Sequence, residues 1–455
     1  MKSLFTDKFN WSIYFLLIII IKLVFRDISW YSFAAISISI YVFFLLFDSI
    51  GSIIPTRHLL AAFMCVQFFI GPTFAYNGID DYQYFLYKMR IPESDYFSYV
   101  IPAVLLFIIG LNIRVQNNDG EKVDIKKIAA FTKRNKSIAY VFIVVGLTAS
   151  IFASFFSSEL AFVFYLLGSF KFIGLFLIIL GEEKLKILPL IIVISSIISS
   201  SLGSGMFHDL ITWFVYIAAI FAIRYKLDYK FKMIGLISFM TLAIVIQVLK
   251  GNYRSATGQN KEAAGVETFA KLYQKENEEK GVFSFANLAE SNVRINQGFI
   301  ITNIMTTVPD KVPYANGSEL YILLEAAIMP RILAPNKLNA GDRTIFTKYS
   351  GIPLTEGTSM GLSTIGDAYL NYGIFGGAIF MFLLGLSYSQ VLKYFKKYAQ
   401  TYPALILFTA MVFYYPIRPD CETQTILGHL VKSCVLIFFI IQIWGPRFKV
   451  NIKQS

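Results

Sequence analysis

The stretch WSIYFLLIIIIKLVF, residues 11–25, carries one charged side chain, Lys22, among residues that are almost all apolar. Such a segment can cross a lipid bilayer, because a helix satisfies its own backbone hydrogen bonds. No small-residue cleavage site follows it, so we expect a retained first membrane helix and not a signal peptide that is removed. Apolar stretches of about 17 to 22 residues, enough to span the hydrocarbon core, recur along most of the chain. The sequence therefore predicts a membrane protein with many spans.

The composition of the whole chain supports the same class. Of its 455 residues, 56% are hydrophobic and 15% are charged, which is not the composition of a soluble protein. The net charge of +12 does not indicate nucleic acid as a partner, because the basic residues lie in loops between apolar stretches and mark membrane topology. The three cysteines and three histidines are too scattered for a metal site. We expect no metal and no other cofactor.

We predict an all-α polytopic integral membrane protein with about twelve transmembrane helices. The expected spans are residues 9–25, 30–47, 58–76, 98–113, 137–156, 159–180, 185–202, 208–223, 232–249, 361–386, 402–416 and 424–444.

The loops between these spans differ in charge in an alternating way. Lys and Arg number seven in residues 112–137, four in 224–232, three in 393–397 and three after the last span. By the positive-inside rule these loops face the cytoplasm, so we expect both termini to lie there. The short loops on the opposite side carry few basic residues: Arg26, Lys88, Arg90 and Arg418.

The same alternation places the one long loop, residues 250–360, on the outer side. This loop holds 12 basic and 11 acidic residues and keeps a helical period in its apolar positions. We expect it to fold as a helical cap that contains the active site, between a first part, 1–249, with nine helices and a last part, 361–455, with three. The segment 318–333 has an apolar face suited to the membrane interface, where a lipid substrate would dock.

Arginine side chains are the first candidates for chemistry on the outer side. A guanidinium keeps its charge in apolar surroundings and offers a rigid fork of donors that fits phosphate. Arg331, which ends the apolar run in EAAIMPRILAPNK (325–337), and Arg294 are the leading candidates for a catalytic role. The alternative is that such arginines reach to the interface or pair with nearby carboxylates. The further candidates for binding a diphosphate or a sugar are Arg254, Arg343 and Arg418.

Two carboxylates are candidate catalytic residues beside these arginines. Glu290 lies one helical turn before Arg294, so the two form an ordinary surface pair, or Glu290 orients the arginine or takes a proton from a sugar hydroxyl. Asp367 lies in the outer part of the tenth span, where a carboxylate is costly unless it has a partner. It is therefore a structural partner of a buried cation or a site residue. The general base stays open among Glu290, Glu319, Glu325 and Asp367.

Tyrosines supply candidate sugar contacts. Tyr314 and Tyr321 lie in the long loop, where they shape the chain or stack on sugar rings, and Tyr369 lies near Asp367. In the same tenth span, three glycines fall close to one helical face, which favours close packing against another helix. They are Gly366, Gly373 and Gly377.

Three stretches, VRINQGFIITNIMTTVPDKVPYANGSELY, MPRILAPNK and TSMGLSTIGDAYLNYGIFGG, resemble the oligosaccharide repeat-unit polymerases of bacteria, the Wzy-type O-antigen and capsule polymerases. The resemblance covers about a quarter of the chain, together with the number of spans and the single long outer loop. Members of this family often carry essential arginines in outer loops, sometimes followed by a glycine after ten residues. Arg254 and Gly265 have this spacing.

The resemblance implies a metal-independent glycosyltransferase of the C-type architecture in the bacterial inner membrane. A growing glycan on a polyprenyl diphosphate would be transferred to a sugar hydroxyl of a lipid-linked repeat unit, and the carrier diphosphate would leave. Arg331, with Arg294 and Arg343, would bind the diphosphate as charge builds on it. The implied partners are the lipid-linked oligosaccharide, membrane lipid, and a chain-length regulator and flippase of the same pathway.

Two rival functions share this architecture. An O-antigen ligase uses the same donor. Ligases resemble one another in using a histidine in the long outer loop, and residues 250–360 of this chain contain none. A flippase or other transporter would show a repeated half-structure and polar groups through the full depth of the membrane, whereas no internal repeat is present here. The polymerase is therefore the preferred hypothesis.

Overall fold

The computed structural model is helical: every secondary-structure element in the part of the chain that it describes is a helix. That part comprises residues 11–78, 87–113, 122–156, 158–259, 264–329, 338, 341–355 and 360–448. Within it, the only β pairing is one isolated bridge between Ile53 and Lys122. The predicted all-α class is therefore confirmed for the described residues.

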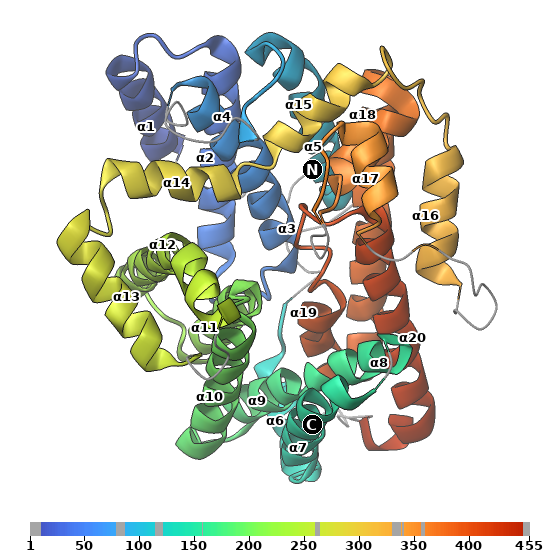
Figure 1. Ribbon diagram of the computed structural model, residues 1–455. Helices are drawn as coiled ribbons and strands as arrows, with labels where there is room; N and C mark the ends of the chain where they lie inside the picture. The colour runs from blue at the N-terminus through green and yellow to red at the C-terminus, as the bar shows by residue number, and fades with distance from the viewer. Residues whose placement is uncertain are drawn as a thin grey trace.

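The helices follow one another along the chain (Figure 1), and η denotes the π and 3-10 turns among them. Their bounds are α1 Trp11–Val24, α2 Trp30–Ser49, α3 Thr56–Cys65, η1 Val66–Ile70, α4 Gly71–Tyr76, α5 Glu93–Asn112, α6 Ile125–Arg134, α7 Ile138–Phe152, η3 Ala153–Phe155, α8 Ser158–Gly168, α9 Phe170–Gly181, α10 Ile187–Ser204, α11 His208–Tyr225, α12 Tyr229–Gln259, α13 Val266–Glu279, α14 Phe285–Ile295, α15 Gly298–Thr307, α16 Ser318–Ile328, α17 Arg343–Ser350, α18 Ser363–Ala399, η5 Pro403–Phe408, α19 Thr409–Val412 and α20 Thr423–Phe448.

Many of these helices are suited to a membrane. Among the described residues, nine are long and apolar enough to cross a bilayer, and a tenth span results if α6 and α7, which meet at 85°, count as one. The predicted first and eleventh spans correspond to shorter helices, α1 and the run Pro403–Val412. The 14 described residues of α1 are fewer than the roughly 20 that a hydrocarbon core requires, and the residues before Trp11 lie outside the described part. The chain is thus a multi-pass membrane protein by composition and helix length, and the total of twelve spans stays a prediction.

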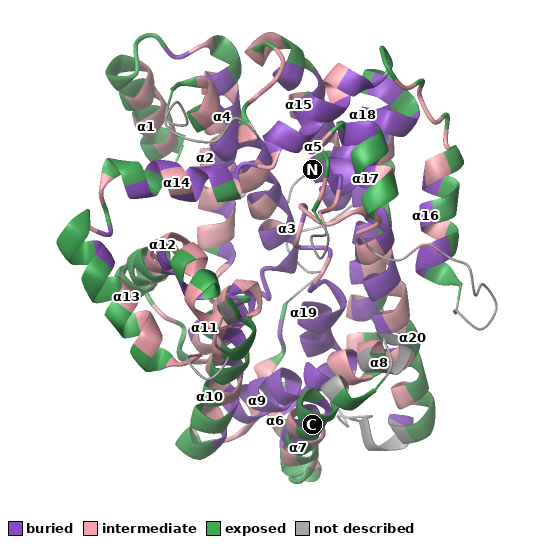
Figure 2. Cartoon of the chain, in the orientation of Figure 1, coloured by how far each residue is buried: buried purple, intermediate pink, exposed green. Residues whose placement is uncertain are grey.

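Helices α5 and α18 pack closely along their length at the centre of the fold. A side chain at Gly110 would collide with the carbonyl oxygen of Phe382, and one at Gly385 would collide with that of Phe107. Glycine at both positions lets the two backbones touch. Figure 2 shows buried residues concentrated on α3, α5, α18 and α19 and exposed residues along α7 and α10. The exposed side chains are largely apolar, for example Leu188 at 69% exposure, as expected of a surface that faces lipid.

Two of the three glycines predicted to pack in the tenth span, Gly366 and Gly377, make close contacts with other elements. A side chain at Gly377 would come within 2.9 Å of the Tyr99 hydroxyl, and one at Gly366 within 2.7 Å of Ile304. Gly373 has a φ of 65°, in the left-handed region, and interrupts the helical backbone of α18. The first part of α18 is therefore a short helical segment that is joined to the cap, and the rest crosses the bundle.

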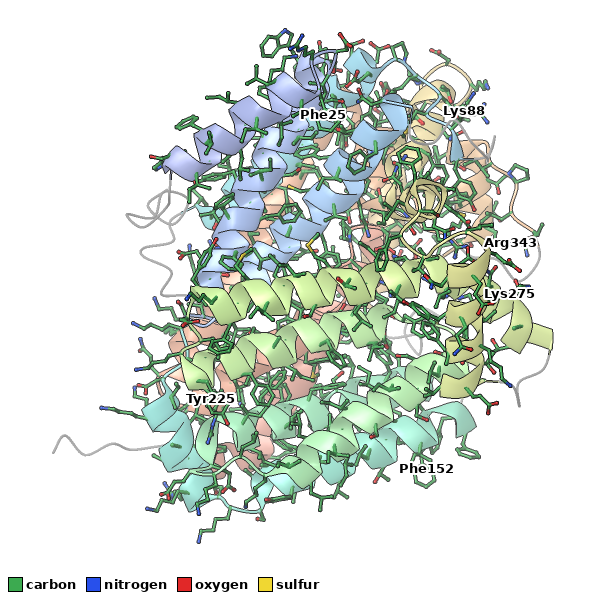
Figure 3. The ribbon with its side chains drawn as sticks, turned by 90° about the vertical axis from the view of Figure 1, so that its left-hand side faces the viewer. Phe25, Lys88, Phe152, Tyr225, Lys275 and Arg343 are labelled. Atoms are coloured by element: carbon green, nitrogen blue, oxygen red, sulfur yellow. The ribbon has the colours of Figure 1, made fainter. Side chains whose placement is uncertain are left out.

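The helices run roughly parallel, so the molecule has two ends (Figure 3). Lys88, Phe152, Lys275 and Arg343 lie toward one of them, which we name the cap end, and Tyr225 lies toward the other. This is the arrangement that strict alternation of the predicted spans requires, since Tyr225 ends the eighth span.

The predicted cap is helical, as α13 to α17 show. It is joined to the bundle where the π turn η1 interrupts the helix between α3 and α4. A wider turn leaves backbone carbonyls without their usual helical partner. The carbonyl of Gln67 accepts from the Gln297 N–H at 3.2 Å, and that of Gly71 accepts from the Asn292 side chain at 3.0 Å. These bonds hold the end of α14 against the bundle.

Candidate functional site

Four basic side chains gather at the cap end from elements far apart in the sequence. They are Lys250 and Arg254 near the end of α12, Arg294 in the last turn of α14 and Arg418 in the loop between α19 and α20. Lys250 lies within electrostatic range of the other three, and Arg254 within range of Arg294. We call this set the cation cluster. Three of its members, Arg254, Arg294 and Arg418, were predicted from the sequence as ligands for a diphosphate.

Arg294 lies directly against the backbone of α12. A side chain on Gly251 would collide with the Arg294 guanidinium, whose central carbon would be 3.1 Å from the added Cβ. On its other side the guanidinium pairs with Glu290 at 3.5 Å, and both side chains are about one-third exposed. The predicted pair of Glu290 and Arg294 is therefore present, and it leaves part of the guanidinium open to solvent.

Arg254 is held by the end of a neighbouring helix. Its Nε donates to the carbonyl oxygen of Gly205 at 2.8 Å. Gly205 ends α10 in the left-handed conformation, with a φ of 63°, and its carbonyl is turned toward α12. The next residue back, Tyr253, is fully buried and donates to the Leu202 carbonyl at 3.0 Å. The position of Arg254 is thus fixed at its Nε, while its side chain stays exposed.

Arg418 extends the cluster toward the interior. Its Nη2 lies 3.4 Å from a carboxylate oxygen of Asp420, and the guanidinium lies 5.4 Å from the ring centre of Tyr415. The Nε is buried and has no hydrogen-bond partner. An unpartnered guanidinium N–H in a buried position is costly, so an acceptor that reached this Nε would stabilise the site.

Asp420 keeps its negative charge in this setting. Burial has the largest single effect and acts to raise the pKa of its carboxyl, but Arg418, His208 and the hydrogen bonds to the carboxylate together outweigh it and hold the pKa below its usual value. A second bond comes from the side-chain amide of Gln67, at 3.4 Å. The described cluster thus has four formal positive charges against the carboxylates of Asp420 and Glu290, and a surplus of positive charge remains for a ligand.

Sequence reasoning did not place Lys250, His208 or Asp420 in this site. His208 begins α11, and its Nε2 lies 3.1 Å from the Thr212 hydroxyl. A signal was available, since α12 carries Lys250 and Arg254 at a spacing of four residues, which places both on one helical face. No sequence spacing could place Asp420 beside His208, because they lie more than 200 residues apart.

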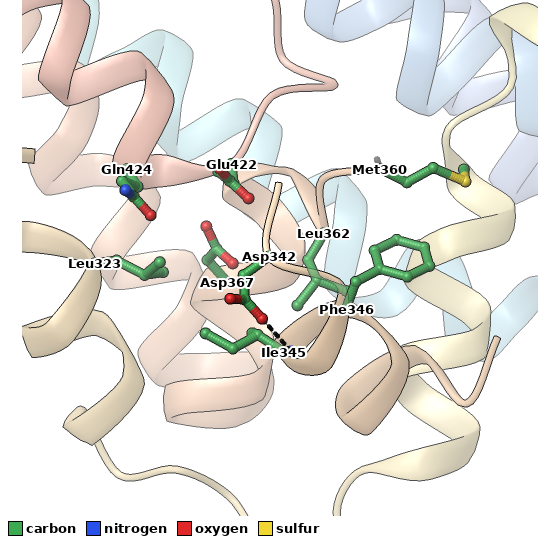
Figure 4. A pocket seen from close by; sticks show the side chains of 9 residues that line it. All are labelled: Leu323, Asp342, Ile345, Phe346, Met360, Leu362, Asp367, Glu422 and Gln424. Carbon is green, nitrogen blue, oxygen red and sulfur yellow. Dashed lines mark hydrogen bonds between the residues drawn. The ribbon is translucent and has the colours of Figure 1, made fainter. Parts of the chain in front are cut away.

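Asp367 lies in a different place, which we call the carboxylate pocket (Figure 4). It is a space of about 10 Å³ lined by Asp342, Asp367, Glu422 and Gln424 together with apolar side chains. A space of this size holds about one water molecule. Asp367 is buried and accepts from the backbone N–H of Thr423 at 2.8 Å, so it fixes the first turn of α20.

The other two carboxylates of the pocket also bind backbone groups. Asp342 accepts from the N–H groups of Thr344 and Ile345 and caps α17. Glu422 accepts from the Gly341 N–H at 2.6 Å and from the Thr425 hydroxyl at 3.0 Å. Burial raises the pKa of Glu422, and these two hydrogen bonds oppose that effect. Each carboxylate is thus satisfied from within the fold.

Of the remaining predicted residues that the structure describes, Tyr314, Tyr321 and Arg343 lie in the cap and Tyr369 lies in α18. Tyr314 and Tyr369 form an edge-to-face pair with ring centres 6.0 Å apart, and the Tyr369 hydroxyl donates to the Val308 carbonyl at 3.4 Å. Tyr321 is 70% exposed on α16. Arg343 is exposed at the start of α17, and Arg331 lies outside the described residues.

The two loop carboxylates that remained candidates for the general base also lie on the cap, in α16. Glu319 accepts from Lys348 and from the Tyr349 hydroxyl, both at 2.9 Å, so it joins α16 to α17. Glu325 lies in the last turn of the same helix.

Comparison with known proteins gives one match. Residues 52–442 match the model of a family that is described as a domain of unknown function, DUF8712. No curated protein and no solved structure matches the chain.

Proposed function

The chain belongs to the DUF8712 family, and we propose that it is a polysaccharide polymerase that transfers a growing glycan from a polyprenyl diphosphate to a sugar hydroxyl of a lipid-linked repeat unit. The proposal places the reaction at the cap end, on the outer face of a bacterial inner membrane. It joins the sequence resemblance to one structural observation, which is the cation cluster.

The cation cluster suits a diphosphate better than a ligand that carries a single negative charge. Guanidinium groups bind phosphate oxygens through paired N–H donors, and Arg254, Arg294 and Arg418 come from three different elements. The unpartnered Nε of Arg418 and the partly open guanidinium of Arg294 leave donors for a ligand. The position of the cluster at the end of membrane helices suits a phosphate whose isoprenoid chain stays in the lipid.

The chemistry that we propose needs charge stabilisation more than covalent catalysis. The bond between the anomeric carbon of the donor sugar and the diphosphate oxygen breaks, and the acceptor hydroxyl oxygen bonds to that carbon. The hydroxyl proton passes to a base, for which Glu290 is the carboxylate beside the cluster. The leaving diphosphate gains negative charge, so cations fixed in advance lower the barrier. Arg331 keeps its predicted role as a further ligand.

Product size measures this function directly. Purified protein is incubated with its polyprenyl-diphosphate repeat unit, and the products are separated by length, beside Arg294→Ala, Arg331→Ala and the control Lys271→Ala. Lys271 lies on α13, is 72% exposed and pairs only with Glu267 in the described structure. We expect a ladder from the wild type and the control that Arg294→Ala lacks. No ladder from folded wild type with authentic substrate would refute the polymerase.

A ligase remains the second candidate, because of His208. The absence of a histidine from the long loop favoured the polymerase, but a membrane helix brings His208 within electrostatic range of Arg418 and Asp420. With a lipid A core acceptor, a ligase would give a single transfer where a polymerase gives a ladder. His208→Gln separates the two further, since only the ligase hypothesis requires that side chain.

A further inference from the structure

A second basic site lies at the end of the bundle opposite the cap. It is a cleft of about 140 Å³ between the start of α6 and the end of α18, and its lining includes Lys122, Lys127 and Lys396. Since a space of about 10–15 Å³ already holds one water molecule, the cleft has room for a phosphodiester group. The floor is apolar and contains Pro403 and Ile406, which are both buried.

The position of the cleft follows from the length of α18. The first part of this helix is bonded to the cap, because the Leu370 carbonyl accepts from the Ala315 N–H at 3.0 Å. After the break at Gly373 the helix continues to Ala399, and this part, residues 374–399, is roughly 39 Å long at 1.5 Å per residue. Lys396 therefore lies far from the cation cluster, and the cleft is independent of the proposed polymerase function.

Helix α6 has the form of a helix that lies in a membrane interface. It meets α7 at 85°, so it runs across the bundle while α7 runs along it. It buries Ile128 and Phe131 against α9 and η5 and carries Lys126, Lys127, Lys133 and Arg134 on its remaining surface. Such a helix, apolar on one face and basic on the other, places its cations at the level of lipid headgroups.

The charges of the cleft select for an anion. Among the described residues, three lysines and one carboxylate, Asp124, line it. That carboxylate is already engaged, because its Oδ1 accepts from the Lys127 N–H at 3.1 Å and caps α6. An apolar floor beneath a basic rim matches a headgroup phosphate that is followed by acyl chains, and basic pockets between membrane helices bind such lipids.

We propose that this cleft binds the phosphate of an anionic phospholipid, with Lys122, Lys127 and Lys396 as its ligands. The three cations come from the loop before α6, from α6 itself and from α18. A bound lipid therefore connects the interfacial helix to the central helix.

Native mass spectrometry of the purified full-length protein tests this site. Phosphatidylglycerol is titrated against phosphatidylcholine with the same acyl chains, for the wild type and for Lys122→Gln/Lys127→Gln/Lys396→Gln. We expect the wild type to retain phosphatidylglycerol preferentially and the triple variant to lose about fivefold in preference for each lysine removed. Equal retention of the two lipids by the wild type would overturn the proposal.

A matched control removes the same charge from the same end of the bundle. Lys184, Lys226 and Lys230 are exposed but do not line the cleft. Lys184→Gln/Lys226→Gln/Lys230→Gln should keep the wild-type preference, and an equal loss in this control would show general surface attraction and refute a specific site. Inorganic phosphate provides another arm, because displacement of the lipid by millimolar phosphate alone would identify a free-anion site instead.

Asp124→Asn provides a second test that does not depend on the folding of the triple variant. Asparagine caps a helix as well as aspartate does, so α6 should keep its start. Removal of the one carboxylate should raise the preference for phosphatidylglycerol by a few fold. An unchanged or lower preference would contradict the electrostatic basis of the proposal.

Discussion

The cation cluster and the carboxylate pocket lie at the same end of the molecule and are joined by a few residues, yet they differ in what their charges do. Arg418 and Asp420 belong to the cluster, and two residues later Glu422 lines the pocket. The cluster is open and has donors without acceptors, whereas each carboxylate of the pocket is bonded within the fold and leaves space for about one water. Charged groups without a partner therefore mark the cation cluster as a candidate binding site, whereas the carboxylate pocket has a structural role.

The largest effect should come from Arg294→Ala. Loss of one fixed cation beside the leaving diphosphate should lower the rate of polymer formation by about 100-fold. Thermal stability in detergent should stay at the wild-type level, because the pair with Glu290 is partly exposed and worth little. The measurement is the initial rate of ladder formation, and a rate within a factor of two of the wild type would remove Arg294 from the site.

Asp367→Ala should show the opposite pattern. The Thr423 N–H would lose its acceptor in a buried position, at a cost of about 1–3 kcal/mol of stability. Asp367→Asn keeps an acceptor and should cost less. Thermal unfolding in detergent measures both variants. If Asp367→Ala kept full stability but lost activity, the pocket would be catalytic and the contrast with the cluster would fail.

Gly251→Ala should show how strongly the reaction depends on the position of the Arg294 guanidinium. The added methyl group would meet the flexible end of Arg294, so the guanidinium should move while the fold stays intact. We expect a loss of roughly tenfold in rate, as for a misplaced catalytic group. Gly258→Ala is the control, because the same helix has open space at that position. Equal rates for the two variants would show that the exact position of Arg294 does not matter.

The smallest effect concerns Glu422 and pH. Burial raises the pKa of Glu422 above its ordinary value of 4.5, so the folded protein holds this proton more tightly than the unfolded chain does. Its contribution to stability is therefore full below pH 4.5 and is lost as pH rises through the raised pKa. Glu422→Gln should remove this part of the pH dependence of the unfolding midpoint. A midpoint with the wild-type pH profile would contradict the assigned cause.

The fold was predictable to the extent that it depends on local pattern. Apolar stretches and alternating loop charge predicted the membrane helices and the helical cap, because both depend on the residue types within one segment. The breaks were not predictable in this way. The π turn at Val66–Ile70 is bonded to the cap, and the left-handed Gly373 lies against Tyr314, so both breaks occur beside residues that lie far away in the sequence.

The candidate site shows the same limit. Residue chemistry alone selected Arg254, Arg294 and Arg418, since arginine on an outer surface suits phosphate. The sequence grouped Asp367 with them, because a carboxylate in a membrane helix is costly without a partner. The partner is the N–H of Thr423, a backbone group that is absent from any side-chain motif.

Ligand binding tests the central claim most directly. Farnesyl diphosphate and farnesyl monophosphate are titrated by calorimetry into the purified protein, into Arg294→Ala/Arg418→Ala, and into Lys271→Ala/Lys275→Ala, which removes two exposed charges from α13. The cation cluster predicts that the wild type and the α13 variant prefer the diphosphate and that the double arginine variant loses this preference. Equal binding of the diphosphate by all three proteins would contradict a diphosphate site at the cluster.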